Sequence, residues 1–219
     1  MVLANASLIV SKWEANTTTI FVEGDSMTYP ATLEIEHPGK IGNWRPLVHW
    51  LLVIPHSLVL SLLGIVATLV AMISWLLVLI TGKLPEGLAN FQCMYLRYST
   101  RVTTYLYGLH VQYPPFSFDT TAADPGGSPV AINFTPALTG RNRLTVLIRF
   151  LMVIPAYIML AVYSIVGAVV SLVGFFAVLF TGSWPNGMFD IMVKVVRFQL
   201  AYSTYALLLT DEYPPLGLE

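Results

Sequence analysis

Four histidines, all in the first half of this 219-residue chain, are the residues best suited to chemistry: His37, His49, His56 and His110. His49 and His56 flank Pro55, and neutral imidazole is a common ligand of haem iron and of other metals. No carboxylate stands near them in the sequence to orient the rings from behind. We therefore expect interfacial histidines whose nitrogens meet headgroup water, and no metal or cofactor site.

The other reactive groups also fit structural roles. Cys93 is the only cysteine, which excludes an internal disulfide, and a buried, inert thiol is expected there. Asp190 and Lys194 have the spacing of an ordinary helical ion pair. No nucleophile, metal set or acid–base pair is visible, so we expect no enzymatic activity. A net charge of −1 gives no nucleic-acid footprint.

Two stripes of polar residues follow helical spacing, one in each half of the chain. Their basic members are Arg97, Arg101, Lys194 and Arg197, and Asp190 belongs to the second stripe as well. A charge that faces lipid costs at least ~2.5 kcal/mol, so these side chains must face protein, water or headgroups. Either their helices span the membrane with the stripe inward, or they lie in the interface with their tyrosines among the headgroups. The spanning arrangement is favoured.

Two long uncharged runs indicate a membrane protein. The chain is 56% hydrophobic and 11% charged, with a mean hydropathy of +0.70, outside the usual range of soluble domains. Residues 47–80 and 150–180 contain no Asp, Glu, Lys or Arg. Both runs exceed the ~20 apolar residues that cross a bilayer. Membrane lipids are therefore the first expected partners.

The chain also repeats itself. TGKLPEG at 81–87 is answered by TGSWPNG at 181–187, and Tyr-Pro-Pro at 113–115 by the same triplet at 213–215. This register indicates an internal repeat. It divides the chain into a polar segment (1–28), a first hairpin repeat (29–119), a linker (120–128) and a second hairpin repeat (129–219). The fold class is an all-α integral membrane protein of two tandem helical hairpins.

Each repeat is expected to begin with a short strand and to turn tightly between its two helices. ATLEIE and VAINF alternate apolar and polar residues, as half-buried strands do, and should pair outside the membrane. Pro55 and Pro155 should separate an interfacial segment from each long helix. Gly82 and Gly182 are placed as caps, and Pro85 and Pro185 as the next helix's first residue. About four membrane helices result.

Small residues form a matched stripe on both long helices, which favours close helix packing in lipid. Packing of one hairpin on the other is the first interpretation, and docking of another membrane subunit is the second. The stripe comprises Ser61, Gly64, Ala67, Ala71, Ser74, Ala161, Ser164, Gly167, Ser171 and Gly174.

Basic residues predict the orientation. Lys40, Arg45, Arg141, Arg143 and Arg149 flank the starts of the long runs, whereas the turns hold only Lys83. The positive-inside rule then places both termini in the cytoplasm, with the two repeats parallel.

Several strings in combination resemble the bacterial domain-of-unknown-function 4389 membrane family, which often occurs as tandem copies. They are RPLVHWLLVIPH, TGKLPEG and TTYLYGLHVQYPPFSFD in the first repeat, and NRLTVLIRFLMVIPAY, LFTGSWPNGMFD and STYALLLTDEYPPLGLE in the second. The resemblance covers residues 29 to 219 and implies a multi-pass protein of the bacterial inner membrane. It implies no catalytic residue.

Two functions remain open at this stage. The first is a non-enzymatic accessory or scaffold subunit that binds other membrane proteins or lipids through its small-residue faces. The alternative is a small transporter or channel for an anionic solute, lined by the polar stripes around Arg97 and Arg197. A transport path requires those arginines to be accessible to water.

Overall fold

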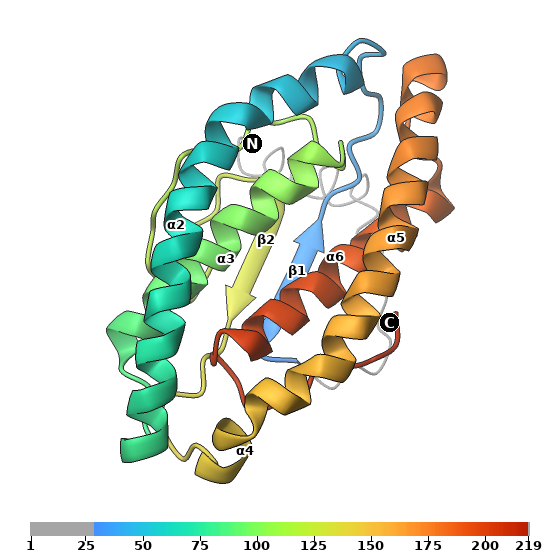
Figure 1. Cartoon of the computed structure of the whole chain (residues 1–219). Helices are drawn as coiled ribbons and strands as arrows, with labels where there is room; N and C mark the ends of the chain where they lie inside the picture. The colour runs from blue at the N-terminus through green and yellow to red at the C-terminus, as the bar shows by residue number, and fades with distance from the viewer. Residues whose placement is uncertain (1–28, 219) are drawn as a thin grey trace, which may run out of the picture.

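The computed structural model describes residues 29–218, so the predicted polar segment 1–28 lies outside the described residues. The elements in chain order are β1 (Ala31–Ile35), α2 (Pro46–Thr81), α3 (Glu86–Leu106), β2 (Val130–Phe134), α4 (Arg143–Leu147), α5 (Arg149–Thr181) and α6 (Asn186–Ala206) (Figure 1). The two predicted helical hairpins are α2–α3 and α5–α6. The structure is mostly helical with a small sheet, as expected.

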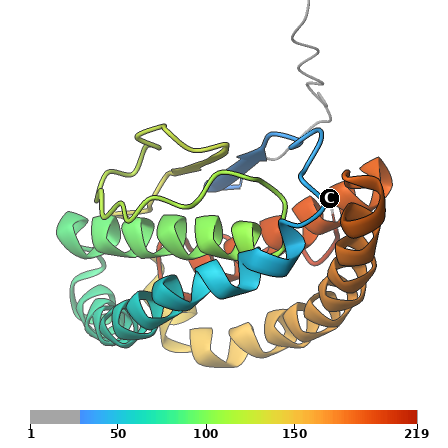
Figure 2. The same ribbon diagram turned by 90° about the horizontal axis from the view of Figure 1, so that it is seen from above.

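Three layers make up the molecule (Figure 2). The long helices α2 and α5 form one side, α3 and α6 form the middle, and the sheet with its loops forms the other side. β1 pairs antiparallel with β2, with Ala31 opposite Phe134, which confirms the predicted strand pairing. Leu33 and Ile132 turn inward and are buried, while Thr32 and Glu34 point outward and are exposed. The sheet therefore has one apolar face, covered by the middle helices, and one polar face.

The two long helices run in opposite directions. The Asn43 side chain, just before α2, donates a hydrogen bond to the Leu179 carbonyl near the end of α5 (3.0 Å). At the other end of α2, the Trp75 indole donates to the Val146 carbonyl in α4 (2.8 Å). Each long helix thus starts beside the other helix's end. The predicted parallel orientation of the repeats is wrong, because a two-fold rotation relates the hairpins.

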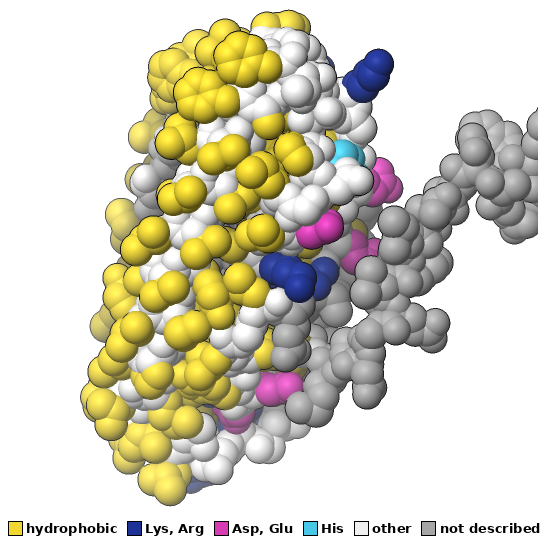
Figure 3. Space-filling view, turned by 90° about the vertical axis from the view of Figure 1, so that its right-hand side faces the viewer, with side chains coloured by type: hydrophobic (Ala, Val, Ile, Leu, Met, Phe, Trp, Pro, Cys, Tyr) yellow, Lys and Arg dark blue, Asp and Glu magenta, His cyan; other side chains and the backbone are white. Residues whose placement is uncertain are grey.

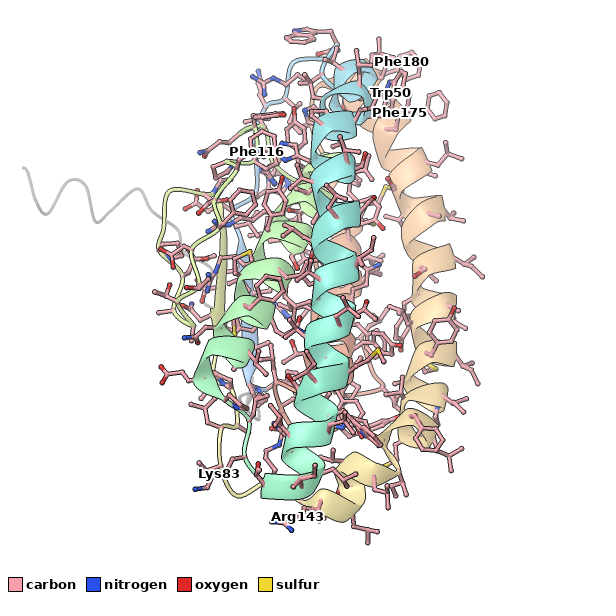
Figure 4. The ribbon with its side chains drawn as sticks, turned by 60° about the vertical axis from the view of Figure 1, so that its left-hand side comes forward. Trp50, Lys83, Phe116, Arg143, Phe175 and Phe180 are labelled. Carbon is pink, nitrogen blue, oxygen red and sulfur yellow. The ribbon has the colours of Figure 1, made fainter. Side chains whose placement is uncertain are left out.

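This arrangement removes the basis of the predicted orientation. Trp50 and Phe180 lie at one end of the molecule, and Lys83 and Arg143 at the other (Figure 4). Lys40 forms a β-bridge with Ser183 at the first end. Basic residues therefore stand at both ends, and the positive-inside rule selects neither.

The prolines do not break the long helices. α2 runs unbroken from Pro46 through Pro55, and α5 runs through Pro155. The expected separate segment appears only in the second repeat, where α4 ends at Leu147, well before the proline. A proline's fixed φ is helical and its ring removes one hydrogen bond, a cost that a long helix can absorb by bending. The predicted break at both prolines is wrong.

The tight turns match the prediction closely. Gly82 and Gly182 both end their helices with a φ of 70°, the left-handed conformation that glycine adopts without strain. The second helices α3 and α6 each begin one residue later than expected. Pro85 and Pro185 are therefore the N-caps of these helices rather than their first residues.

At the second turn, Trp184 packs against Gly174 of α5, and the first repeat has different residues at both positions. A Cβ on Gly174 would lie 2.1 Å from the Trp184 ring, whereas the equivalent residues of the first repeat are Ser74 and Leu84, both buried. We expect Gly174→Ser to lower the free energy of unfolding by at least about 1–3 kcal/mol through overpacking. Trp184→Leu should cost about 2 kcal/mol by leaving a cavity.

The double variant Gly174→Ser/Trp184→Leu installs the first repeat's pair, so it should be at least about 1 kcal/mol more stable than the sum of the single losses predicts. Chemical denaturation of the four purified proteins in one detergent measures this coupling. Strictly additive losses would show that the ring does not fill the space above Gly174.

Candidate membrane interface

A continuous apolar surface, here called the α2/α5 face, covers the side of the molecule opposite the sheet. Hydrophobic side chains gather on that side and charged ones on the other (Figure 3). Leu62 is 62% exposed and Ile165 is 66% exposed. Soluble monomers rarely expose apolar patches of more than a few hundred Å². The face includes Leu58, Leu62, Ile65, Leu69 and Met72 of α2, and Ile158, Val162, Ile165, Val169 and Leu172 of α5.

Two helices of the described residues, α2 and α5, are long and apolar enough to cross a membrane. At 1.5 Å per residue, α2 is about 54 Å and α5 about 50 Å long, against a hydrocarbon core of about 30 Å. The shorter helices α3 and α6 do not meet this criterion, so the expected total of four spans is not confirmed.

Three members of the small-residue stripe, Gly64, Ala67 and Gly167, pack within each hairpin rather than between hairpins. A Cβ on Gly64 would meet the Tyr95 hydroxyl at 3.4 Å, and one on Gly167 would meet Val195 at 3.1 Å. Gln92 donates a hydrogen bond to the Ala67 carbonyl (2.7 Å). All three partners, Tyr95, Val195 and Gln92, belong to the second helix of the same hairpin. The remaining members are buried (Ser74, Gly174), half-buried (Ala71, Ser171) or exposed (Ser61, Ala161, Ser164).

The first polar stripe anchors a loop against the sheet. Arg97 and Arg101 are only 3% and 2% exposed. Arg97 donates to the carbonyls of Ile132, Asp119 and residues 121–123. Arg101 forms a bidentate pair with Asp124, at 2.8 and 3.0 Å. These guanidinium groups therefore hold β2 and the loop before it, a role that the sequence did not indicate.

The second polar stripe also faces the sheet. Arg197 donates to the Leu33 carbonyl of β1 (3.4 Å), which mirrors the bond between Arg97 and Ile132 of β2. Lys194 is exposed, and its ammonium donates to the Leu218 carbonyl near the C-terminus (3.1 Å). Arg97 and Arg197 thus bind equivalent carbonyls of the two strands, whereas Arg101 and Lys194 have different partners.

A second arginine cluster, which the sequence analysis missed, holds the C-terminal loop. Arg149 lies 4.3 Å from the Tyr205 ring centre and donates to the Thr210 carbonyl at 2.8 Å. Arg149 and Arg141 both pair with Asp211. Burial alone would raise the pKa of Asp211, but the bonds and charges of the two arginines outweigh it and lower the pKa. These arginines are structural and do not mark a membrane side.

Burial of the histidines overturns the expectation of interfacial rings. His49, His56 and His110 are all less than 5% exposed, and only His37 is exposed. His49 stacks on Tyr105, with ring centres 4.3 Å apart, and His56 bonds to the Tyr98 hydroxyl at 2.6 Å. Aromatic residues of α3 and of the loop after it cover the rings.

Within residues 29–218 there is no group of three His, Cys, Asp or Glu side chains placed to hold a metal ion. Cys93 is buried, as predicted, and burial raises the pKa of its thiol to about 12, which keeps it unreactive.

His110 should make stability depend on pH. Burial lowers its pKa, and this outweighs the opposite effect of its hydrogen bond to the Arg101 carbonyl. Below its ordinary pKa of about 6.5, the unfolded histidine binds a proton that the folded one refuses. The free energy of unfolding should therefore fall as the pH drops from about 7 to about 5.

His110→Thr, which copies Thr210 of the second repeat, should make this decline shallower, while the buried His49 and His56 keep their own effects. Denaturation curves at three pH values within that window measure both proteins. An unchanged slope would show that His110 titrates alike in the folded and unfolded chains.

The fold and these contacts define a class of protein, an inverted-repeat helical protein with two membrane-length helices and a two-stranded sheet on one side. The family described as a domain of unknown function (DUF4389) matches the chain twice, over residues 43–117 and 143–216. The chain belongs to this family as a tandem two-copy member, as the sequence predicted. No curated protein and no solved structure matches the chain.

Proposed function

We propose that this protein is a non-enzymatic membrane accessory protein that lies in one leaflet. Its α2/α5 face is immersed in lipid, and its sheet and loops are presented to water. The observation that carries the proposal is the one-sided distribution of side chains, apolar on one side and charged on the other (Figure 3), with exposed apolar residues along both long helices. Helices that run along the membrane surface need not match its thickness, so lengths of 36 and 33 residues cause no mismatch.

An upright arrangement is less favourable for a single copy of the chain. The sheet and the loop before β2 run beside the helices, so they would lie at the depth of the hydrocarbon core. Irregular backbone and open sheet edges are not tolerated against lipid, because their polar groups have no partner there. The exposed Glu34 would add at least ~2.5 kcal/mol if it stayed charged at the bilayer centre.

The accessory role follows from what the polar side contains. Its buried charges, Arg97, Arg101 and Asp124, are engaged in holding the loop and the strand. A rigid sheet surface held above the membrane suits the binding of another protein, and the immersed face suits lipids and membrane subunits.

The alternative is an anion transporter, for which the arginines must line a water-accessible path. Arg97 and Arg101 are buried against loop carbonyls and a carboxylate, and Arg197, although exposed, bonds to the Leu33 carbonyl of the sheet, which argues against a path lined by these arginines. An upright oligomer with the sheets around a central lumen would be the form that such a transporter takes.

Vesicle flotation of the purified full chain tests membrane binding directly. Attachment through an apolar face should survive about 1 M salt and alkaline carbonate and yield only to detergent, because salt screens charges and leaves burial intact. Release by salt, or a water-soluble dimer that covers the face, would contradict the proposal. Mass spectrometry of proteins recovered with the chain from its native membrane then tests the accessory role.

A further inference from the structure

A cavity of about 260 Å³ lies between the two hairpins. Ser99 and Thr103 of α3 and Gln199 and Ser203 of α6 line it, and Leu160 and Ser164 of α5 form one wall. Residues 99 and 199 occupy equivalent positions in the two repeats, as do 103 and 203. The cavity therefore lies close to the two-fold axis that relates the hairpins.

The cavity lies on the α5 side of α3 and α6 and not on their sheet side. Ser99 follows Arg97 by two residues, and Thr103 follows Arg101 by two, so each points to the opposite side of α3 from its arginine. Both arginines bind the sheet layer. The lining from α5 confirms the direction, because α5 belongs to the apolar layer.

Hydrogen-bonding capacity in this cavity is largely unused. Ser99 donates to the Leu96 carbonyl of its own helix (3.0 Å). The side chains of Thr103, Ser164, Gln199 and Ser203 make no hydrogen bond to any other residue within 29–218. Polar groups that are left unsatisfied in an apolar setting are costly, so a ligand with matching donors and acceptors is favoured there.

The lining also fixes the chemistry of that ligand. No charged side chain lines the cavity, so a phosphate or another ion would be desolvated without a counter-charge. Hydroxyls and one amide can both donate to and accept from hydroxyl and ester groups. The volume corresponds to roughly nine water molecules at about 30 Å³ each, enough for a glycerol unit with its ester carbonyls.

We propose that this cavity binds the uncharged glycerol-ester end of a neutral lipid of the diacylglycerol type, whose acyl chains lie along the α2/α5 face. The inference rests on the proposed function, since it needs that face to be immersed in lipid. A hydroxyl-lined cavity beside an apolar face provides both the polar and the apolar contacts that such a lipid requires.

Photo-crosslinking tests the proposal with the full chain in phosphatidylcholine nanodiscs and a photoactivatable diacylglycerol as the probe. We expect saturable labelling of peptides from α3, α6 and the Leu160–Ser164 stretch of α5. Gln199→Leu/Ser203→Leu, which fills the cavity, should weaken half-saturation at least tenfold. Gln199→Met/Ser203→Ala removes the polar groups with little change in bulk, and a weakening of about 5- to 150-fold is expected of about two lost hydrogen bonds.

Ser61→Leu is the matched control, because Ser61 is an exposed serine on α2 outside the cavity, and it should label like the unaltered chain. Unchanged labelling of both cavity variants, or labelling that never saturates, would overturn the proposal. Equal labelling by a photoactivatable phosphatidylglycerol would overturn the preference for an uncharged lipid. A chain that floats with vesicles but shows no specific labelling loses only this inference, whereas a chain that does not float loses the proposed function.

Discussion

Replacing Asp124 with alanine is expected to lower the free energy of unfolding by about 3–5 kcal/mol, the typical cost of removing one partner of a buried ion pair. The Asp124 carboxylate accepts from Arg101 at 2.8 and 3.0 Å and lies 3.9 Å from the Arg97 Nε. It also accepts from the backbone N–H groups of Gly126 and Ile132. Its loss leaves a buried guanidinium without its carboxylate and two backbone donors without an acceptor.

Chemical denaturation in detergent measures this loss, and Asp119→Ala is the control, because Asp119 is an exposed carboxylate in the same loop. Arg101→Met in the Asp124→Ala background should restore part of the stability, since it removes the uncompensated charge. A loss of less than about 1 kcal/mol for Asp124→Ala would place this pair among ordinary surface ion pairs and contradict its role as an anchor.

Placing one carboxylate on each long helix, as Leu62→Glu/Ile165→Glu, should weaken binding to vesicles at least about 100-fold, because a single charge in the membrane costs about 2.5 kcal/mol or more. Both side chains project from the α2/α5 face and are mostly exposed, so the fold should tolerate the change. Flotation over a range of lipid concentrations gives the partition coefficients of the variant and the unaltered chain.

The matched control places two carboxylates on the polar side of the molecule, as Thr32→Glu/Thr120→Glu. Both positions are exposed, and neither side chain makes a hydrogen bond to another residue within 29–218. This variant should bind vesicles like the unaltered chain. Equal weakening by both double variants would show that net charge, and not the α2/α5 face, controls membrane binding.

Local features of the fold could be read from the sequence because short-range chemistry determines them. The glycines of the two turns require a left-handed conformation, and the alternation in residues 31–35 and 130–134 marks two half-buried strands. Proline was the exception. Its local preference predicted a break at Pro55, but the fixed φ of proline is itself helical, and a long helix absorbs the loss of one hydrogen bond by bending.

The relative orientation of the repeats was not predictable in this way, because a parallel and an inverted pair of hairpins have the same local sequence. The direction in which β1 and β2 pair depends on the same relative orientation. Two equivalent strands related by a two-fold rotation pair antiparallel, whereas a simple translation would have paired them parallel. The predicted parallel orientation of the repeats counted Arg141 and Arg149 as charges that flank the membrane helices. In the structure both are buried partners of Asp211.

The second arginine cluster also left a trace in the repeat alignment. The second repeat has Arg149 and Asp211, and the equivalent residues of the first repeat are His49 and Val111. Both members of the ion pair are therefore present in one repeat and both are replaced in the other. Such a matched difference indicates contact more strongly than either residue alone. The histidines were misplaced because their position at a helix start suggested the headgroup region, while the covering aromatic residues are distant in sequence.

Side-specific labelling of the two turns tests the one-leaflet arrangement most directly. Glu86 and Asn186 are equivalent, exposed first residues of α3 and α6, at opposite ends of the molecule, and Glu34 lies on the outer face of the sheet. Each is replaced by cysteine in a Cys93→Ser background, and a membrane-impermeant maleimide is added to right-side-out and inverted vesicles. The account predicts that all three cysteines react in the same vesicle orientation and are protected in the other. Reaction of Glu86→Cys and Asn186→Cys in opposite orientations would show that the long helices cross the membrane and would contradict it.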